Sequence, residues 1–297
     1  MNKTWIVGTR GSKLALKQTE IVVNQLQKTY PGNTFQVKII KTMGDTVWDK
    51  PLHLIGGKGL FVKEIEEELL AGTIDFAVHS MKDMPTELEQ KLAIGAILKR
   101  EDPRDVFLSL KYKNFKDVPD GGRIGTNSLR RQSQILFHKN LNVIPIRGNV
   151  DTRIRKMESE DLDGILLAYA GVARMGFVSQ IREVLPFDIM VPPSGQGAIG
   201  VETRNENEML SMLEPLNDEK SFKEVTIERN LQMKIGGGCN IPLGINAAID
   251  EQTLILNIFF GTENGVVLIK DRQVGEVEDA ERLINSAVVK LNSCRFK

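Results

Sequence analysis

Apolar and polar residues alternate along the first hundred positions in a way that predicts strands and helices in turn. Runs such as FQVKII repeat with the period of two that is typical of strands, whereas other stretches repeat with the spacing of a helix. Pro31-Gly32 breaks the first of these helical stretches. Strands are predicted over 4–9, 35–40, 75–80 and 92–98, and helices over 12–28 and 60–70, the latter with Glu64, Glu66, Glu67 and Glu68 on its solvent side.

The pattern then repeats with new elements and changes near position 221. Strands are predicted over 121–126, 142–146 and 164–170, followed by helices over 127–137, 150–157 and a third that starts at 171–176. Beyond Ser221 the pattern predicts a helix over 224–233, strands over 255–260 and 266–270, and a last helix over 279–291. Strands that alternate with helices indicate crossover units and a largely parallel sheet, and the last part indicates a small α+β domain.

Composition narrows the class of protein. The chain has 297 residues, 41% of them hydrophobic, and equal numbers of basic and acidic residues, 39 of each. A nucleic-acid-binding protein usually has a basic excess, so the zero net charge argues against one. We find no apolar run long enough to span a membrane and no signal peptide at the start, which predicts a cytoplasmic protein. With only Cys239 and Cys294, no disulfide framework is expected.

The arginines are unevenly placed. Nine of the sixteen lie between Arg100 and Arg174, and several of these fall where predicted strands end and helices begin. The carboxyl ends of strands and the N-termini of helices are where α/β proteins bind ligands, and helix N-termini favour anions. Any one arginine can be a solvated surface residue. However, Arg or Lys lies at or soon after the ends of five predicted strands, and together these residues predict a cleft for a ligand with several carboxylates or phosphates.

Two other residues are candidates for chemistry. Asp83 lies among basic residues, either as an ion-pair partner or helix cap, or as a carboxylate that stabilises a developing cation. Cys239 follows three glycines, which leaves its sulfur uncrowded, although a lone cysteine is more often inert and buried. A Cys–His nucleophile pair has no supporting spacing, and His79 reads as a packed residue. Three histidines and the lack of a C-x-x-C pair predict no metal site.

Eight motifs, in order along the chain, resemble the porphobilinogen deaminase family, also called hydroxymethylbilane synthase. They are GGKGLFVKEIE, DFAVHSMKDMP, REDPRD, GTNSLRRQ, RGNVDTR, LAYAGVARMG, GQGAIGVE and GGGCNIPLG. The resemblance implies an α/β protein with two periplasmic-binding-protein-like lobes around a central cleft and a small α+β C-terminal domain. It implies a first lobe of residues 1–99 and 200–219, a second lobe of 100–199, and a C-terminal domain of 220–297.

The resemblance also implies an activity. The family condenses four porphobilinogen molecules head to tail into linear hydroxymethylbilane, releases ammonia, and is primed by a dipyrromethane cofactor held through a thioether, here on Cys239. Asp83 is implied to be catalytic. Porphobilinogen is the only implied partner of what would be a monomer. The implied cofactor- and substrate-binding residues are Arg10, Lys58, Phe61, Ser80, Lys82, Thr126, Asn127, Ser128, Arg130, Arg131, Arg147, Arg153, Arg174 and Gln196.

Some positions depart from the family pattern. Leu54 stands where a lysine is usual, and it can form no ion pair with a ligand. The others are Met43, Asn127, Pro193-Ser194 and Asn240.

The competing hypothesis is a module that only binds a small anion. Such a module needs neither an aspartate in its anion site nor a glycine-exposed thiol, so we favour the enzyme.

Overall fold

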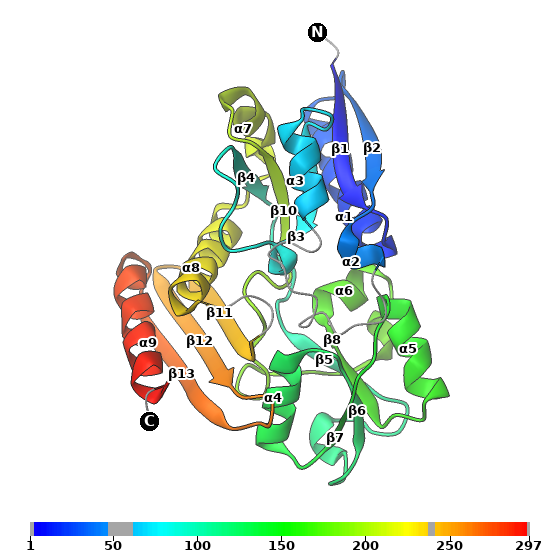
Figure 1. Ribbon diagram of the computed structural model, residues 1–297, viewed down its shortest axis with the longest axis vertical. Coiled ribbons are helices and arrows are strands. Elements are labelled where there is room, and N and C mark those ends of the chain that lie inside the picture. The colour runs from blue at the N-terminus through cyan, green and yellow to red at the C-terminus, as the bar shows by residue number, and fades with distance from the viewer. Residues whose placement is uncertain (1–2, 47–61, 237–240, 296–297) are drawn as a thin grey trace. The chain divides into compact units, whose positions relative to one another are not determined.

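The fold is described from a computed structural model, which describes residues 3–46, 62–236 and 241–295 (Figure 1). The chain divides into two compact units. The first unit comprises residues 1–100 and 198–223, and the second comprises 101–197 and 224–297. The chain therefore leaves the first unit after Arg100 and returns to it at Ala198.

The first unit contains a five-stranded sheet in the order β2-β1-β3-β10-β4. Four strands run in one direction, and β10 is antiparallel to both of its neighbours. The sheet is thus largely parallel, as predicted, with one reversed strand next to the edge strand β4. The strands are β1 (Thr4–Arg10), β2 (Thr34–Ile40), β3 (Phe76–Ser80), β4 (Leu92–Ile97) and β10 (Ile199–Arg204).

Helices cover both faces of this sheet because consecutive strand residues, which point to opposite faces, are apolar. Phe76 and Val78 of β3 pack with Val22 and Leu26 on one face, whereas Ala77 packs with Ile65 on the other. The helices of the unit are α1 (Lys13–Thr29), α2 (Met43–Thr46), α3 (Lys63–Leu70), α7 (Asn207–Leu213) and the start of α8 (Glu219–Ile235), with short 3₁₀ turns η2 (Met81–Asp83) and η5 (Glu214–Leu216).

The second unit repeats the plan. Its five-stranded sheet has the order β7-β6-β8-β5-β9, and here β5 is the reversed strand. The strands are β5 (Asp105–Leu108), β6 (Arg123–Gly125), β7 (Asn142–Ile144), β8 (Gly164–Ala168) and β9 (Ile181–Val184). The helices are α4 (Leu129–His138), α5 (Val150–Ser159) and α6 (Tyr169–Arg174), with 3₁₀ turns η3 (Phe115–Asp117) and η4 (Val178–Gln180).

Close packing in this sheet depends on one glycine. A Cβ on Gly164 of β8 would lie 2.2 Å from the ring of Phe107 and 2.8 Å from the carbonyl of Leu108. Phe107 is fully buried and belongs to the core that α4 covers through Ile135. The bare backbone at Gly164 therefore lets β5 and β8 lie side by side with a large aromatic residue between sheet and helix.

The last part of the chain forms the predicted small α+β domain. Three antiparallel strands in the order β11-β12-β13 pack against α8 and α9 (Figure 1). Leu231 of α8 and Ile284 of α9 are buried against Leu254 and Ile258 of the sheet. The elements are β11 (Leu243–Asp250), β12 (Thr253–Gly261), β13 (Val267–Glu276), η6 (Val277–Asp279) and α9 (Ala280–Arg295).

The α/β fold class is confirmed by these three sheets, but several elements differ from the expectation. The strand predicted over 164–170 ends at Ala168, and its helix starts at Tyr169 rather than near 171. Four strands, β5, β9, β10 and β11, were not predicted. The predicted division into three domains stays a prediction. Among the described helices, none is long and apolar enough to cross a membrane.

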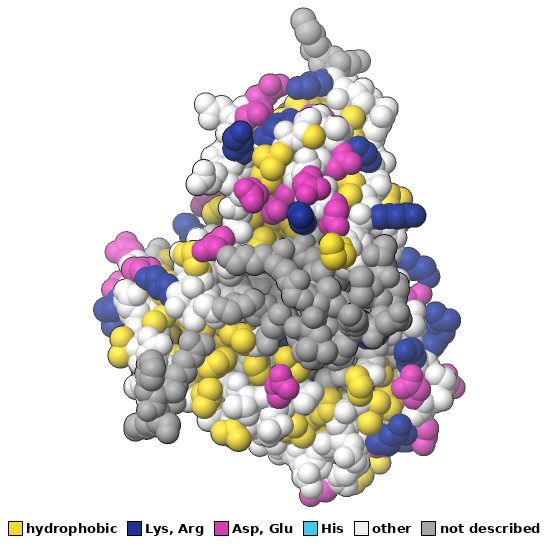
Figure 2. All heavy atoms as spheres, viewed as in Figure 1, with side chains coloured by type: hydrophobic (Ala, Val, Ile, Leu, Met, Phe, Trp, Pro, Cys, Tyr) yellow, Lys and Arg dark blue, Asp and Glu magenta, His cyan; other side chains and the backbone are white. Residues whose placement is uncertain are grey.

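The glutamates of α3 do not all lie on the solvent side as predicted. Figure 2 shows acidic side chains gathered over this part of the first unit, and Glu67 is exposed. Glu64 and Glu66, however, are only half-exposed, and one carboxylate oxygen of each is buried, Oε2 of Glu64 and Oε1 of Glu66. The prediction was wrong for these two because helical spacing does not show which residues beside the apolar stripe are covered by neighbouring elements.

Candidate active site

The first unit carries a pocket at the edge where β1 and β3 end. Arg10, Ser12, Ser80 and Asp83 line it together with His79, and its volume is about 70 Å³. Arg10 is the last residue of β1, and Asp83 lies in the 3₁₀ turn that follows β3. Because β1 and β3 are parallel, their carboxyl ends bring these side chains to one edge of the sheet. The structure thus brings together three of the predicted residues, Arg10, Ser80 and Asp83.

Two hydroxyl groups of this pocket are fixed from α1. The Ser12 side chain caps the helix by accepting a hydrogen bond from the Ala15 N–H at 3.2 Å. Gln18, one turn further on and 3% exposed, donates from Nε2 to Ser80 Oγ at 2.8 Å and accepts from it at 3.1 Å. The carboxamide of Gln18 therefore holds the Ser80 hydroxyl in one orientation beside Asp83.

A buried acid–histidine pair lies in the same sheet. His79 Nε2 is 3.1 Å from Glu202 Oε2, and the side chains are 4% and 0% exposed. His79 is thus a packed residue, as predicted, although a carboxyl group faces it. Burial, together with the negative charge of Glu202, raises the pKa of Glu66 on α3 to about 7, while His79 acts in the opposite direction.

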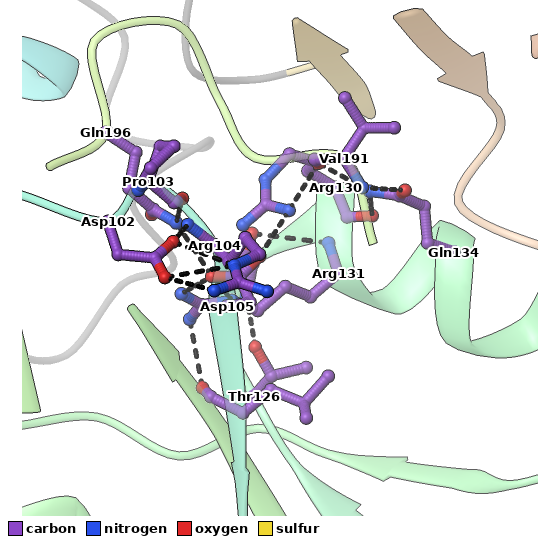
Figure 3. A network of polar contacts seen from close by, with 12 residues as sticks. Asp102, Pro103, Arg104, Asp105, Thr126, Arg130, Arg131, Gln134, Val191 and Gln196 are labelled. Carbon is purple, nitrogen blue, oxygen red and sulfur yellow. Dashed lines mark hydrogen bonds and ion pairs between the residues drawn. The ribbon is translucent and has the colours of Figure 1, made fainter. Parts of the chain in front are cut away.

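In the second unit, two predicted arginines meet at one carboxylate (Figure 3). Arg130 Nη1 lies 2.7 Å from Asp105 Oδ2, and Arg131 donates to Asp105 Oδ1 from Nη2 at 2.7 Å and from Nε at 3.2 Å. Asp105 is 0% exposed, and the arginines are 5% and 6% exposed. Burial alone would raise the pKa of Asp105, but both guanidinium charges and their hydrogen bonds outweigh burial and hold that pKa far below its usual value.

The reversed strand explains how this carboxylate reaches the arginines. Asp105 is the first residue of β5 and pairs with Ala168, the last residue of β8. Since β5 runs against β8, its first residue lies at the edge where β8 ends. Arg130 and Arg131 enter from the first turn of α4, whose N-cap Ser128 accepts a hydrogen bond from the Arg131 N–H at 3.4 Å.

The loop before β10 adds further contacts. Gln196 is 1% exposed and donates from Nε2 to Asp105 Oδ1 at 3.0 Å and to the Pro103 carbonyl at 2.8 Å. Arg174 donates from Nη2 to the Gly197 carbonyl at 2.6 Å, and burial lowers the pKa of Arg174. Gly197 has φ +90°, and a Cβ there would lie 2.3 Å from the Glu101 carbonyl oxygen. Only glycine fits this turn without strain.

The remaining predicted residues of the second unit lie at or after the same edge. Thr126 directly follows β6, is buried, and its Oγ1 accepts a hydrogen bond from the Ser128 N–H at 3.2 Å. Arg153 donates from Nε to the Gly148 carbonyl at 2.7 Å, which ties it to the loop that carries Arg147. Asn127 is half-buried next to Thr126. Lys82, in the first unit, is half-buried beside Asp83.

Three predicted site residues lie outside the described residues, namely Lys58, Phe61 and Cys239. The departure at Leu54 lies there as well. Their predicted roles stay predictions.

Three side chains of these sites were not predicted to have a role. Gln18, Asp105 and Glu202 are all buried: Gln18 and Asp105 contact members of the predicted set, and Glu202 faces His79. The burial of Asp105 could have been predicted, because this aspartate directly precedes an apolar run (VFL) and therefore lies at the start of a buried strand. Glu202 likewise stands inside the run IGVET.

The chain is an α/β protein with basic, partly buried sites at the carboxyl edges of two sheets, and comparisons with known proteins define its family. A family model described as the dipyromethane cofactor binding domain of porphobilinogen deaminase matches residues 5–212, and one for the C-terminal domain of porphobilinogen deaminase matches 222–292. Together the two models cover most of the chain.

Curated relatives agree with the family models. A porphobilinogen deaminase from Carboxydothermus hydrogenoformans is 46% identical over 285 residues, 95% of this chain and 92% of the relative. One from Geobacillus kaustophilus is 48% identical over 278 residues, 93% of this chain and 90% of the relative. The chain therefore belongs to the porphobilinogen deaminase family, whose members are enzymes of tetrapyrrole (haem) biosynthesis that use a dipyrromethane cofactor.

A putative methionine-binding lipoprotein from Bacillus subtilis, a solved structure, aligns with a TM-score of 0.45 and 14% identity, over 73% of this chain and 92% of that one.

Proposed function

We propose that the chain condenses four porphobilinogen molecules head to tail into hydroxymethylbilane, with release of four ammonia molecules. The observation that carries this proposal is the buried trio of Asp105, Arg130 and Arg131, which holds two positive charges against one negative charge. A buried net positive charge destabilises a protein unless an anion neutralises it. Porphobilinogen and the pyrroles built from it carry acetate and propionate groups, so each ring brings the carboxylates that such a site requires.

The dipyrromethane fits the same donor set. Guanidinium groups form paired, charge-assisted hydrogen bonds with carboxylates, each worth about 1.5–3 kcal/mol when water is excluded. We assign its carboxylates to the predicted basic residues, and its attachment to the thiol of Cys239. When bound, the dipyrromethane supplies the pyrrole carbon that starts the growing chain. The residues of this protein then bind carboxylates, place the reacting ring and move protons.

Asp83 is the residue to which we assign the chemistry. It lines the pocket that also contains Arg10, Ser12 and Ser80. As ammonia leaves, positive charge develops on the substrate pyrrole, whose N–H is a donor. A fixed carboxylate stabilises that charge where it develops and can accept the proton lost in the next bond-forming step. Arg10 supplies a cation at the same pocket for an acetate or propionate group.

The attachment of the cofactor is tested by the intact mass of the purified protein. We expect an excess over the sequence mass equal to two linked pyrroles, lost in Cys239→Ser because the hydroxyl is a far weaker nucleophile than the thiolate. Cys294→Ser is the matched control and should keep the excess mass. If the wild-type protein shows no excess, or Cys239→Ser keeps it, the proposed attachment is wrong. The cytoplasmic location and the monomeric state stay predictions.

A further inference from the structure

Asp105 is the common partner of the buried basic residues in the second unit. Its Oδ1 atom accepts hydrogen bonds from Arg131 and from Gln196, and its Oδ2 atom pairs with Arg130 (Figure 3). The two arginines have one further contact each, with the carbonyls of Val191 and Leu166, at 2.7 Å and 3.0 Å. Asp105 is therefore the only described acidic side chain that forms an ion pair with either arginine.

The charge of the trio distinguishes it from an ordinary structural ion pair. A structural pair is neutral, because an uncompensated charge inside a protein is strongly destabilising. Here two guanidinium groups share one carboxylate, which leaves a net charge of +1 in a place where the three side chains are at most 7% exposed. One carboxylate of a ligand would neutralise the trio.

The carboxylate also restricts the arginines. A free arginine side chain loses rotamer entropy when a ligand fixes it. In this chain Asp105 has already fixed both guanidiniums, and Gln196 fixes Asp105 in turn. A site held in this way binds its ligand without paying that entropy at the moment of binding.

We propose that Asp105 is a positioning residue, which holds Arg130 and Arg131 in place for one ligand carboxylate and sets the charge of that site at +1. The inference rests on the proposed function, because it takes the two arginines to bind a carboxylate of the dipyrromethane or of the growing chain. Asp105 itself contacts the arginines and not the ligand.

The test compares Asp105→Asn with wild type and with Asp163→Asn. Asp163 is a carboxylate of the same unit that accepts from the Arg123 N–H and pairs with Lys111, so it controls for a general loss of stability. We expect Asp105→Asn to lower the fraction of protein carrying the cofactor mass, and to raise KM for porphobilinogen about tenfold or more, the effect of losing one charged hydrogen bond. The control should keep both values, although its melting temperature falls.

Asp105→Glu keeps the charge but moves the carboxylate by one methylene. This variant replaces Asp105→Asn in the test if Asp105→Asn does not fold. We expect its KM to rise at least threefold with kcat less affected. Wild-type cofactor load and KM in either folded Asp105 variant would overturn the inference alone. A wild-type protein with neither cofactor mass nor turnover would overturn the proposed function, and the inference with it.

Discussion

The two five-stranded sheets share one strand order but use their reversed strands differently. In each sheet the reversed strand is next to the edge strand and carries a buried carboxylate, Glu202 on β10 and Asp105 on β5. Glu202 faces a histidine, which carries at most one charge, whereas Asp105 faces two arginines that are always charged. The same topological position thus supports a buried acid–histidine pair in one unit and a permanent cation site in the other.

The comparison also separates chemistry from binding. The pocket of the first unit contains Asp83, an exposed carboxylate beside Arg10 and Ser80, whereas the acid of the second unit is enclosed by its arginines. An enclosed acid held far below its usual pKa cannot accept a proton near neutral pH. We therefore expect changes at Asp83 to act mainly on kcat and changes in the arginine pair to act mainly on KM.

The largest effect is expected for Asp83→Asn. The carboxamide has nearly the same shape but no charge to stabilise the developing cation, and it cannot accept a proton, so kcat should fall about 10²–10⁴-fold. Single-turnover release of ammonia measures this, with the exposed Glu89→Gln as control. The cofactor mass should be retained. Ammonia release at the wild-type rate in Asp83→Asn would show that the chemistry lies elsewhere.

Arg131→Leu should act on binding and on stability. The leucine removes two hydrogen bonds to Asp105 but leaves that carboxylate its partner Arg130, so the free energy of unfolding should fall by about 1–3 kcal/mol. Fewer elongation steps should be completed, because the growing chain has lost a carboxylate partner. Chemical denaturation and the length distribution of enzyme-bound intermediates measure the two effects. Unaltered yield of the four-ring product would contradict the assigned role.

Glu66→Gln should remove a pH dependence that belongs to the first unit. The pKa of Glu66 is raised from 4.5 to about 7, so its protonated form is favoured in the folded state. The stability it contributes is complete below pH 4.5 and is lost as pH rises through 7. Because Glu66 is half-exposed, we expect a difference on the order of 1 kcal/mol between pH 5 and pH 8.

The measurement is chemical denaturation of wild type and Glu66→Gln at both pH values. The glutamine variant should lose less stability on going to pH 8. Asp105 supplies the contrast, since its lowered pKa confines its own effect to acid below about pH 4. Parallel pH curves for the two proteins would rule out a role for Glu66.

The smallest effect is expected for Gln18→Met, a substitution of similar volume. It removes the hydrogen bonds that hold Ser80 Oγ, and should cost about 0.5–1.5 kcal/mol of stability. A modest rise in KM should accompany this cost, because the Ser80 hydroxyl is no longer held. Gln25→Met, further along the exposed side of α1, is the control. Equal melting temperatures and KM values in the two variants would show that Ser80 needs no support.

Much of the fold could be predicted because short stretches of sequence determine many of its helices and strands. Ser12 and Ser128 begin helices by capping them, and the apolar runs of β1, β3 and β8 stand out against polar surroundings. The reversed strands could not be predicted in the same way. β5 has four residues, and β10 pairs with residues 103 to 127 positions earlier in the chain, so no short window of sequence contains its partners.

The same distinction between local and long-range features applies to the residues of the candidate site. Arg10, Ser80, Asp83, Arg130 and Arg131 follow strands or open helices, so the sequence alone predicted that they would lie at sheet edges. Their supports, Gln18 and Asp105, come from other elements, and only the folded chain shows which side chain each one holds. The burial of Arg130 and Arg131 was also not foreseen, because arginine is rarely enclosed without a partner.

The late arrival of β10 has a consequence for synthesis. The first sheet has β4 at one edge, and the strand that joins β4 to β3 is made only when residues 199–204 emerge from the ribosome. Until then β3 and β4 each have an unpaired edge in the nascent chain, and unpaired strand edges promote aggregation. Residues 101–197 meanwhile include every strand of the second sheet. We therefore expect the middle of the polypeptide to reach its native pairing before its beginning does.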